Sequence, residues 1–137
     1  MKSLLLSCKN FESKVNKLAT RPKTVKPEGI IKDGYTAQKS IVTLITVEEG
    51  DDVKMSAKKL AEEIRKFSED TDIKTIVVFP FAHLSNKLAT SEESLNFLDL
   101  LESELDGLDI IRVHFGSHKS LLLDVHDHVG NVRFREF

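Results

Sequence analysis

Two apolar, β-branched segments on either side of an amphipathic stretch constrain most strongly how this chain can fold. Residues 40–48 (SIVTLITVE) and 74–80 (KTIVVFP) are almost continuously apolar or β-branched, as is typical of strands buried on both faces. Between them, apolar residues recur at helical spacing: Ala57, Leu60, Ala61, Ile64 and Phe67. Asp51 or Asp52 precedes this stretch as a candidate N-cap. The pattern predicts a strand–helix–strand unit, and therefore a sheet with helical cover.

A second helix and several short strands follow from the remaining patterns. Thr90 and Glu93 have capping-box spacing, the leucines at 95, 98, 101 and 105 form an apolar face, and Gly107 is a natural stop. Strands are expected at residues 4–6, 110–114, 121–125 and 132–137, the last alternating like an edge strand, with a turn at 128–131. Residues 12–38 lack a clear period and are expected to be mostly loop. We expect an α/β (α+β) fold, with two helices packed on one sheet, in a single domain spanning residues 1–137.

Composition excludes several classes of protein. The single cysteine, Cys8, rules out an intrachain disulfide, and its apolar surroundings predict a small buried or half-buried side chain. No apolar run approaches the roughly 20 residues that span a bilayer, and no secretory signal is recognisable, so we expect a cytoplasmic protein without membrane contact. The sequence contains no GxGxxG, P-loop or CxxC pattern.

Charge is distributed unevenly along the chain. Residues 1–40 hold nine Lys or Arg and three Asp or Glu, although the whole chain carries a formal charge of −2. The basic residues of this part include Lys14, Lys17, Arg21, Lys23, Lys26 and Lys32. Such a cluster can meet nucleic-acid phosphates, or it can belong to a solvated loop.

Two short segments place chemically active groups just beyond predicted strands. The first, residues 79–85 (FPFAHLS), presents an imidazole and a hydroxyl where open α/β sheets usually place ligands; the alternative is a core plug with a hydrogen-bonded His83. The second, residues 114–119 (HFGSHK), combines a tight turn at Gly116 with Lys119, which can bind an oxygen or remain a surface lysine. His126 and His128 form a possible metal pair, but without further ligands a polar turn is the better interpretation.

The segment Pro80-Phe81-Ala82-His83-Leu84-Ser85, followed by Leu88-Ala89, resembles the signature of the archaeal threonyl-tRNA synthetase editing domain. The N-terminal Leu-Leu strand, the strand end Ile45-Thr46-Val47-Glu48, and Phe115-Gly116 followed by Lys119 occur in the matching order. The resemblance covers essentially the whole chain. It implies a D-aminoacyl-tRNA deacylase-like fold and the hydrolysis of serine wrongly attached to threonine tRNA, without a metal or other cofactor.

The resemblance also implies roles for individual residues. Lys119 would be the main catalytic contributor, and His83 would support the loop or a water molecule without being an obligatory base, because the 2′-hydroxyl of the tRNA helps to activate water. The substrate-binding residues by match are Val47, Pro80, Phe81, Ala82, Phe115, Gly116, His118 and Glu136. Implied partners are threonine tRNA, a second copy of the chain in a homodimer, and the rest of a threonyl-tRNA synthetase, joined to the chain or separate.

The sequence departs from the family pattern in three places. Ser7-Cys8-Lys9 stands where the family often has His-Ser-Asp, His118 replaces an aromatic residue, and Glu136 is the one candidate for a late acidic residue. Two other functions remain open from the residues: a D-aminoacyl-tRNA deacylase and a non-catalytic RNA-binding module. The second has few stacking platforms, because the chain has no Trp and only Tyr35 besides its phenylalanines.

Overall fold

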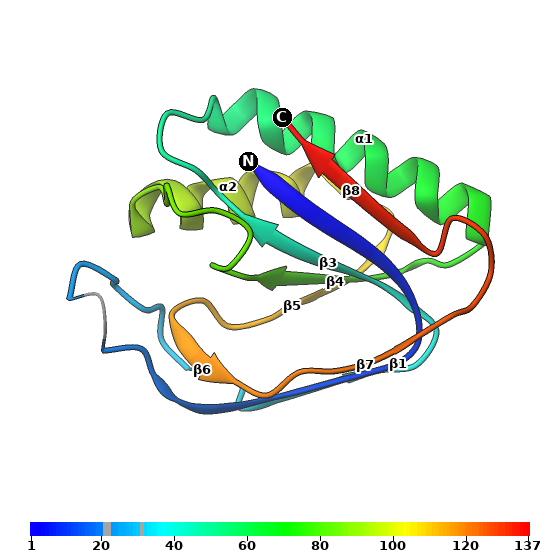
Figure 1. The fold of residues 1–137 in the computed structure, drawn as a ribbon, viewed down its shortest axis with the longest axis horizontal. Coiled ribbons are helices and arrows are strands. Elements are labelled where there is room, and N and C mark those ends of the chain that lie inside the picture. Colours follow the sequence, from blue (N-terminus) through cyan, green and yellow to red (C-terminus); the bar gives the residue numbers. More distant parts are fainter. Residues whose placement is uncertain (21–22, 31) are drawn as a thin grey trace.

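A long first strand organises the molecule. The computed structural model describes residues 1–20, 23–30 and 32–137. Strand β1 (Lys2–Leu18) pairs through its first half with β3 (Ser40–Thr46) on one side and β8 (Val132–Glu136) on the other. Its second half pairs with β2 (Gly34–Ala37), β7 (Leu122–Val125) and β6 (Ser117–Lys119). β1 therefore sweeps from the helical side of the molecule to the opposite side, and the sheet curls with it (Figure 1).

The expected strand–helix–strand unit forms the centre of the sheet. β3 is followed by α1 (Val53–Thr71) and then by β4 (Thr75–Pro80), which lies parallel to β3. α2 (Ser91–Glu104) connects β4 to β5 (Asp109–Arg112), which is parallel to β4. Both helices lie on the same side of this part of the sheet (Figure 1). The two-helix α+β architecture predicted from the sequence is confirmed.

The predicted caps explain where the helices begin. Asp52 accepts a hydrogen bond from the amide of Met55 at the start of α1. Thr90 and Glu93 form the complete capping box of α2. α2 ends at Glu104, earlier than predicted, and Gly107 follows with a φ of 89°.

The expectation that residues 12–38 are mostly loop is wrong at both ends of that range. β1 continues to Leu18, and β2 occupies Gly34–Ala37; residues 21, 22 and 31 lie outside the described part of the chain. Phe11 and Ser13 alternate with more exposed neighbours, as in a strand buried on one face. The strand partners β6 and β7 lie about a hundred residues away in sequence, so no local pattern reveals the pairing. The short strand β6 was also not expected.

The core consists of two layers on opposite faces of the sheet. One layer packs beneath α1 and α2 and includes Leu60, Ile64, Phe67 and Phe97. The other fills the concave side of the curled sheet and includes Phe11, Tyr35, Val77, Phe79 and Cys8. Cys8 is buried there as predicted, and burial raises the pKa of its thiol to about 11. It therefore packs as a neutral, small apolar side chain.

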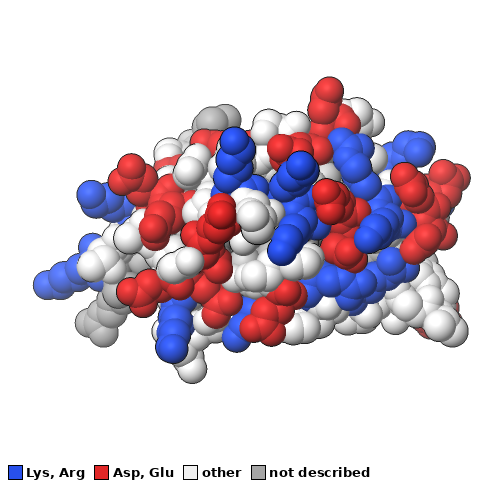
Figure 2. Space-filling model, turned by 90° about the horizontal axis from the view of Figure 1, so that it is seen from above, with Lys and Arg blue, Asp and Glu red and all other residues white. Residues whose placement is uncertain are grey.

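Within the described residues, neither helix is long and apolar enough to cross a membrane. On the side where α1 lies, Lys and Arg alternate with Asp and Glu over the surface (Figure 2). Arg133 and Arg135 of β8 contribute to this pattern by pairing with Asp70 and Glu63 of α1, at 3.0 Å and 2.7 Å. This face therefore offers no single-sign patch for a highly charged ligand.

Candidate functional site

The loop after β4 is held in place by the end of the neighbouring strand β3. The amide of Phe81 donates to the carbonyl of Ile45 at 2.8 Å. The hydroxyl of Thr46 donates to the carbonyl of Phe81 and accepts from the amide of Leu84 at 3.3 Å. Because β3 and β4 are parallel, both strands end at the same edge of the sheet, where α/β folds commonly bind ligands.

A second anchor fixes the far side of this loop. The Ser85 hydroxyl donates to the Glu48 carboxylate at 2.5 Å, and this hydrogen bond lowers the pKa of Glu48. Glu48 also contacts the N-terminal ammonium of Met1 at 3.0 Å. Between the two anchors, the amides of Ala82 and His83 donate no hydrogen bond to any described residue. These two N–H groups remain available to an oxygen atom of a ligand.

His83 lies at the exposed tip of the loop. Its ring packs edge-on against Phe81, with 5.0 Å between the ring centroids. No described residue makes a hydrogen bond with the imidazole. The alternative interpretation, in which the His83 ring makes a hydrogen bond with a buried carbonyl, therefore finds no support among the described residues.

The turn after β5 supplies the opposite wall of the site. Gly116 has a φ of 84°, and a Cβ atom there would lie 2.5 Å from the Cα of Pro27. Glycine is the residue that tolerates both the left-handed conformation and this close approach. The carbonyl of Gly116 accepts from the amide of Ala19 at 2.8 Å, so the turn is also tied to the end of β1.

Lys119 lies on β6, which follows this turn, and its side chain points into the site. Its Nζ donates to the carbonyl oxygens of His114 and Ser117 at 2.9 Å and 3.3 Å, and lies 5.4 Å from the centre of the Phe79 ring. Burial lowers the pKa of the Lys119 ammonium to about 8, while the carboxylate of Glu28 acts in the opposite direction. The side chain is therefore a positioned cation near neutral pH that becomes neutral as the pH rises past about 8.

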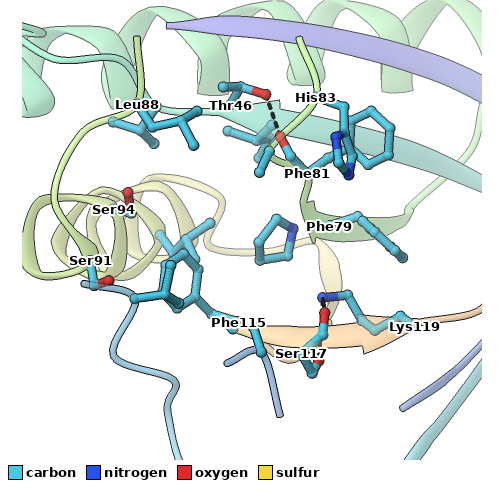
Figure 3. A pocket seen from close by; sticks show the side chains of 18 of the residues that line it. Thr46, Phe79, Phe81, His83, Leu88, Ser91, Ser94, Phe115, Ser117 and Lys119 are labelled. Atoms are coloured by element: carbon cyan, nitrogen blue, oxygen red, sulfur yellow. Dashed lines mark hydrogen bonds between the residues drawn. The ribbon is translucent and has the colours of Figure 1, made fainter. Parts of the chain in front are cut away.

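These segments enclose a pocket of about 390 Å³, a size typical of small-molecule sites. Figure 3 shows Lys119 and Ser117 on one side, and Thr46, Phe81 and His83 on the other. Phe115 and Leu88 contribute apolar surface, and Ser91 and Ser94 border the pocket from the first turns of α2. The pocket thus has apolar walls and, among the described residues that line it, Lys119 as the one Lys or Arg side chain, opposite the loop that carries the Ala82 and His83 amides.

The structure brings together nearly all the residues predicted from the sequence. The pocket is lined by Val47, Pro80, Phe81, Ala82, His83, Phe115, Gly116, His118 and Lys119. Glu136 does not line it; this residue lies on β8, opposite Lys2 of β1. Sequence reasoning missed Thr46, Ser91, Ser94 and Ser117 as part of the site. A polar residue at the end of a buried strand was the available signal for Thr46, whereas the serines of α2 carried no distinguishing pattern.

The second histidine pair lies elsewhere. His126 and His128 both contact the Ser7 hydroxyl in the first half of β1, at 2.9 Å and 3.1 Å, and none of these three residues lines the pocket that contains Lys119. Among the residues that the structure describes, no three His, Cys, Asp or Glu side chains are grouped so as to hold a metal ion. Both imidazoles therefore share one hydroxyl as a hydrogen-bond partner.

The chain matches known proteins along nearly its full length. The model of the archaea-specific editing domain of threonyl-tRNA synthetase matches residues 1–135. The chain is 32% identical over 132 residues to the threonine–tRNA ligase of Staphylothermus marinus, with 93% of this chain and 21% of that protein aligned. It is 26% identical over 126 residues to the threonine–tRNA ligase editing subunit of Saccharolobus solfataricus, with 91% and 31% aligned.

These alignments cover about a fifth to a third of the length of the curated relatives. Among solved structures, the c-Myc DNA unwinding element binding protein is similar in fold, with a TM-score of 0.59 and 12% identity. That likeness covers 100% of this chain and 99% of the other, and shows that the two chains share an α+β fold. The sequence matches, above all the family model over residues 1–135, lead to one conclusion: the chain belongs to the archaea-specific editing domains of threonyl-tRNA synthetase.

Proposed function

We propose that this domain hydrolyses the ester between L-serine and the terminal adenosine of threonine tRNA. The observation that carries the proposal is that Lys119 lines the pocket opposite the loop of Ala82 and His83, whose amides have no partner among the described residues. This arrangement suits an ester, whose carbonyl oxygen becomes negatively charged when water attacks. N–H groups and an ammonium fixed in advance can stabilise that charge without reorganising.

The pocket does not need a strong base of its own. An aminoacyl ester is already activated, so positioning the water and the carbonyl accounts for much of the required acceleration. In the proposed mechanism, the 2′-hydroxyl of the terminal adenosine helps to orient the attacking water, and Lys119 stabilises the charge on the oxygen. The ester C–O bond then breaks, the ribose oxygen takes up a proton, and serine and tRNA are released. No cofactor takes part in this scheme.

Selectivity is the physical reason for such a site. Threonine differs from serine by one methyl group, and binding alone discriminates a methyl by only about 1–3 kcal/mol. The proposed site acts after the amino acid has been selected and attached to the tRNA, and it must leave correctly attached threonine in place. We propose that threonyl-tRNA is not hydrolysed because the methyl group of threonine would occupy the space that the attacking water needs.

The basic N-terminal region offers a route for tRNA binding. Ala19 and Val25 line the pocket, and the exposed Lys17, Lys23 and Lys26 flank them in sequence. Lys14 and Lys32 belong to the same region; Arg21 lies outside the described residues. We propose that these lysines contact phosphates near the 3′ end of the tRNA, which would make binding weaken with salt. The rest of a threonyl-tRNA synthetase, joined or separate, would supply tRNA identity.

A substrate panel tests the proposal. Purified protein is mixed in excess with threonine tRNA carrying L-serine, L-threonine or a D-amino acid, and the release of each amino acid is followed. We expect fast release of L-serine alone, an unchanged rate in EDTA, and weaker binding at high salt. Preferred release of the D-amino acid would identify the other deacylase function, and tRNA binding without any release would identify a non-catalytic module.

A further inference from the structure

Glu28 contacts the wall of the pocket through both its side chain and its backbone. One carboxylate oxygen accepts from the amide of Phe115 at 2.8 Å, and the other lies 3.7 Å from a guanidinium nitrogen of Arg112. Its carbonyl contacts His114 Nε2 at 2.8 Å, and its amide donates to the carbonyl of Phe115 at 3.3 Å. Glu28, which lies between β1 and β2, therefore holds His114 and Phe115 in place through hydrogen bonds just before the Gly116 turn.

A chain of hydrogen bonds leads from the backbone carbonyl of Glu28 to Lys119. A carbonyl oxygen only accepts, so His114 must donate from Nε2, and in the neutral ring Nδ1 is then an acceptor. That nitrogen lies 2.8 Å from the Ser117 hydroxyl, which donates to it. The Ser117 oxygen in turn lies 3.4 Å from Lys119 Nζ. His114 is buried, so this order of donors and acceptors is shielded from competing water.

The charges around Lys119 give Glu28 a second influence. Glu28 is the carboxylate that favours the charged ammonium, against the effect of burial. Among the described residues, the other charged or titratable groups on the surrounding elements include His118 on β6, Arg112 on β5, Tyr35 on β2 and His83 across the pocket. His114, whose carbonyl contacts Lys119, and Lys14 and Lys17 on β1, which pairs with β6, belong to the same set. Arg112 is itself shared between Glu28 and the carboxylates of Asp99 and Glu102 on α2.

We propose that Glu28 is a positioning residue of the editing pocket: it fixes the Phe115–Gly116 turn and thereby positions the Lys119 ammonium for the substrate. Glu28 itself does not line the pocket. Its effect on catalysis rests on the proposed function, because it acts through Lys119.

Two substitutions separate its two effects. Glu28→Gln keeps an oxygen that can accept from the Phe115 amide but removes the charge, whereas Glu28→Ala removes both. Glu104→Gln is the matched control, since it removes an exposed carboxylate at the end of α2 away from the pocket. The measurements are the pH profile of single-turnover release of serine, and the pH titration of the Lys119 Cε signal by NMR.

The proposal predicts a distinct result for each variant. In Glu28→Gln, both the NMR midpoint and the loss of activity with rising pH move to lower pH. In Glu28→Ala, the maximal single-turnover rate also falls, by about 10-fold or more, with a smaller change in half-saturation, because misplacement affects chemistry before binding. Glu104→Gln behaves as the wild type.

The proposal would be overturned if the pH profiles and NMR titrations of both Glu28 variants superimposed on those of the wild type. A wild-type protein that releases no amino acid would instead refute the proposed function. In that case the NMR midpoint, measured without substrate, still decides whether Glu28 controls the charge of Lys119.

Discussion

At the scale of single residues, the burial of Lys119 links its pKa both to the stability of the fold and to the proposed hydrolysis. Its pKa in the folded chain is about 8, against 10.5 for an unperturbed lysine. Between these values the unfolded chain binds more protons than the folded one, so the free energy of unfolding rises with pH through this window. The proposed catalysis runs the opposite way, because the ammonium is lost as pH passes about 8.

Replacing Lys119 should therefore separate stability from activity. Lys119→Met should lower the single-turnover rate near neutral pH by about 10²-fold or more, since it removes charge stabilisation in the transition state. It should also abolish that lysine's contribution to the rise in stability above pH 8, measured by urea unfolding. Lys54→Met, at an exposed lysine on α1, serves as the control. Unchanged single-turnover rates in Lys119→Met would exclude the catalytic role.

His83 should matter less than the substrate's own hydroxyl. An obligatory general base contributes about 10²–10⁴-fold, but the His83 ring is exposed and contacts Phe81 without a hydrogen bond to any described residue. We expect His83→Ala to be mild and replacement of the tRNA 2′-hydroxyl by hydrogen to be severe, both measured at saturating enzyme. A deoxy-terminated substrate, with serine on the 3′ oxygen, that is hydrolysed at the normal rate would return the role of base to His83.

At the scale of elements, the turn between β5 and β6 depends on glycine for two reasons that can be measured separately. In Gly116→Ala, the alanine would have to adopt the left-handed backbone conformation, at a φ of 84°, and its Cβ atom would clash with the backbone of Pro27. Gly130→Ala is a matched control: its φ is 74°, but the nearest atom lies 3.8 Å away, at the end of Arg133.

Each alanine should cost about 1–2 kcal/mol of stability for the left-handed conformation. Gly116→Ala should cost more than Gly130→Ala in urea unfolding, and it alone should lower deacylation, since its turn carries Lys119. Equal effects of the two substitutions on stability and activity would show that contact with Pro27 does not shape the pocket.

The elements also show where sequence reasoning succeeds. The strands and helices from Ser40 to Glu104 were predictable because their apolar periods and caps are local. The extension of β1 was not, because its pairing with β6 and β7 is formed by residues far along the chain. For the site, the two motifs identified the main walls, while Ser91 and Ser94 joined them through the packing of α2. Glu28 was missed for the same reason, as its partners lie more than eighty residues away.

At the scale of the whole molecule, we expect two copies to associate through the β8 side of the sheet. In the described part of the chain β8 pairs with β1 alone, which leaves its other edge open. Val132 and Phe134 are 48% and 49% exposed on this strand. An open edge beside exposed apolar side chains is a surface that proteins usually cover.

Light scattering checks this expectation directly. The wild type should show twice the monomer mass of 15.5 kDa, and Phe134→Asp should weaken the dimer. Val129→Asp, at a fully exposed turn residue outside β8, should leave it intact. A monomer at high protein concentration would contradict the prediction of a homodimer.

The proposed editing function is tested most directly by the ratio of single-turnover rates for threonine tRNA charged with L-serine and with L-threonine. Both substrates share the tRNA and the ester, so the ratio isolates the effect of one methyl group in the pocket. We expect the wild type to release serine much faster than threonine, and Lys119→Met to lose most of the serine rate. Equal release of both amino acids, or release of neither above the uncatalysed rate, would contradict the proposed function.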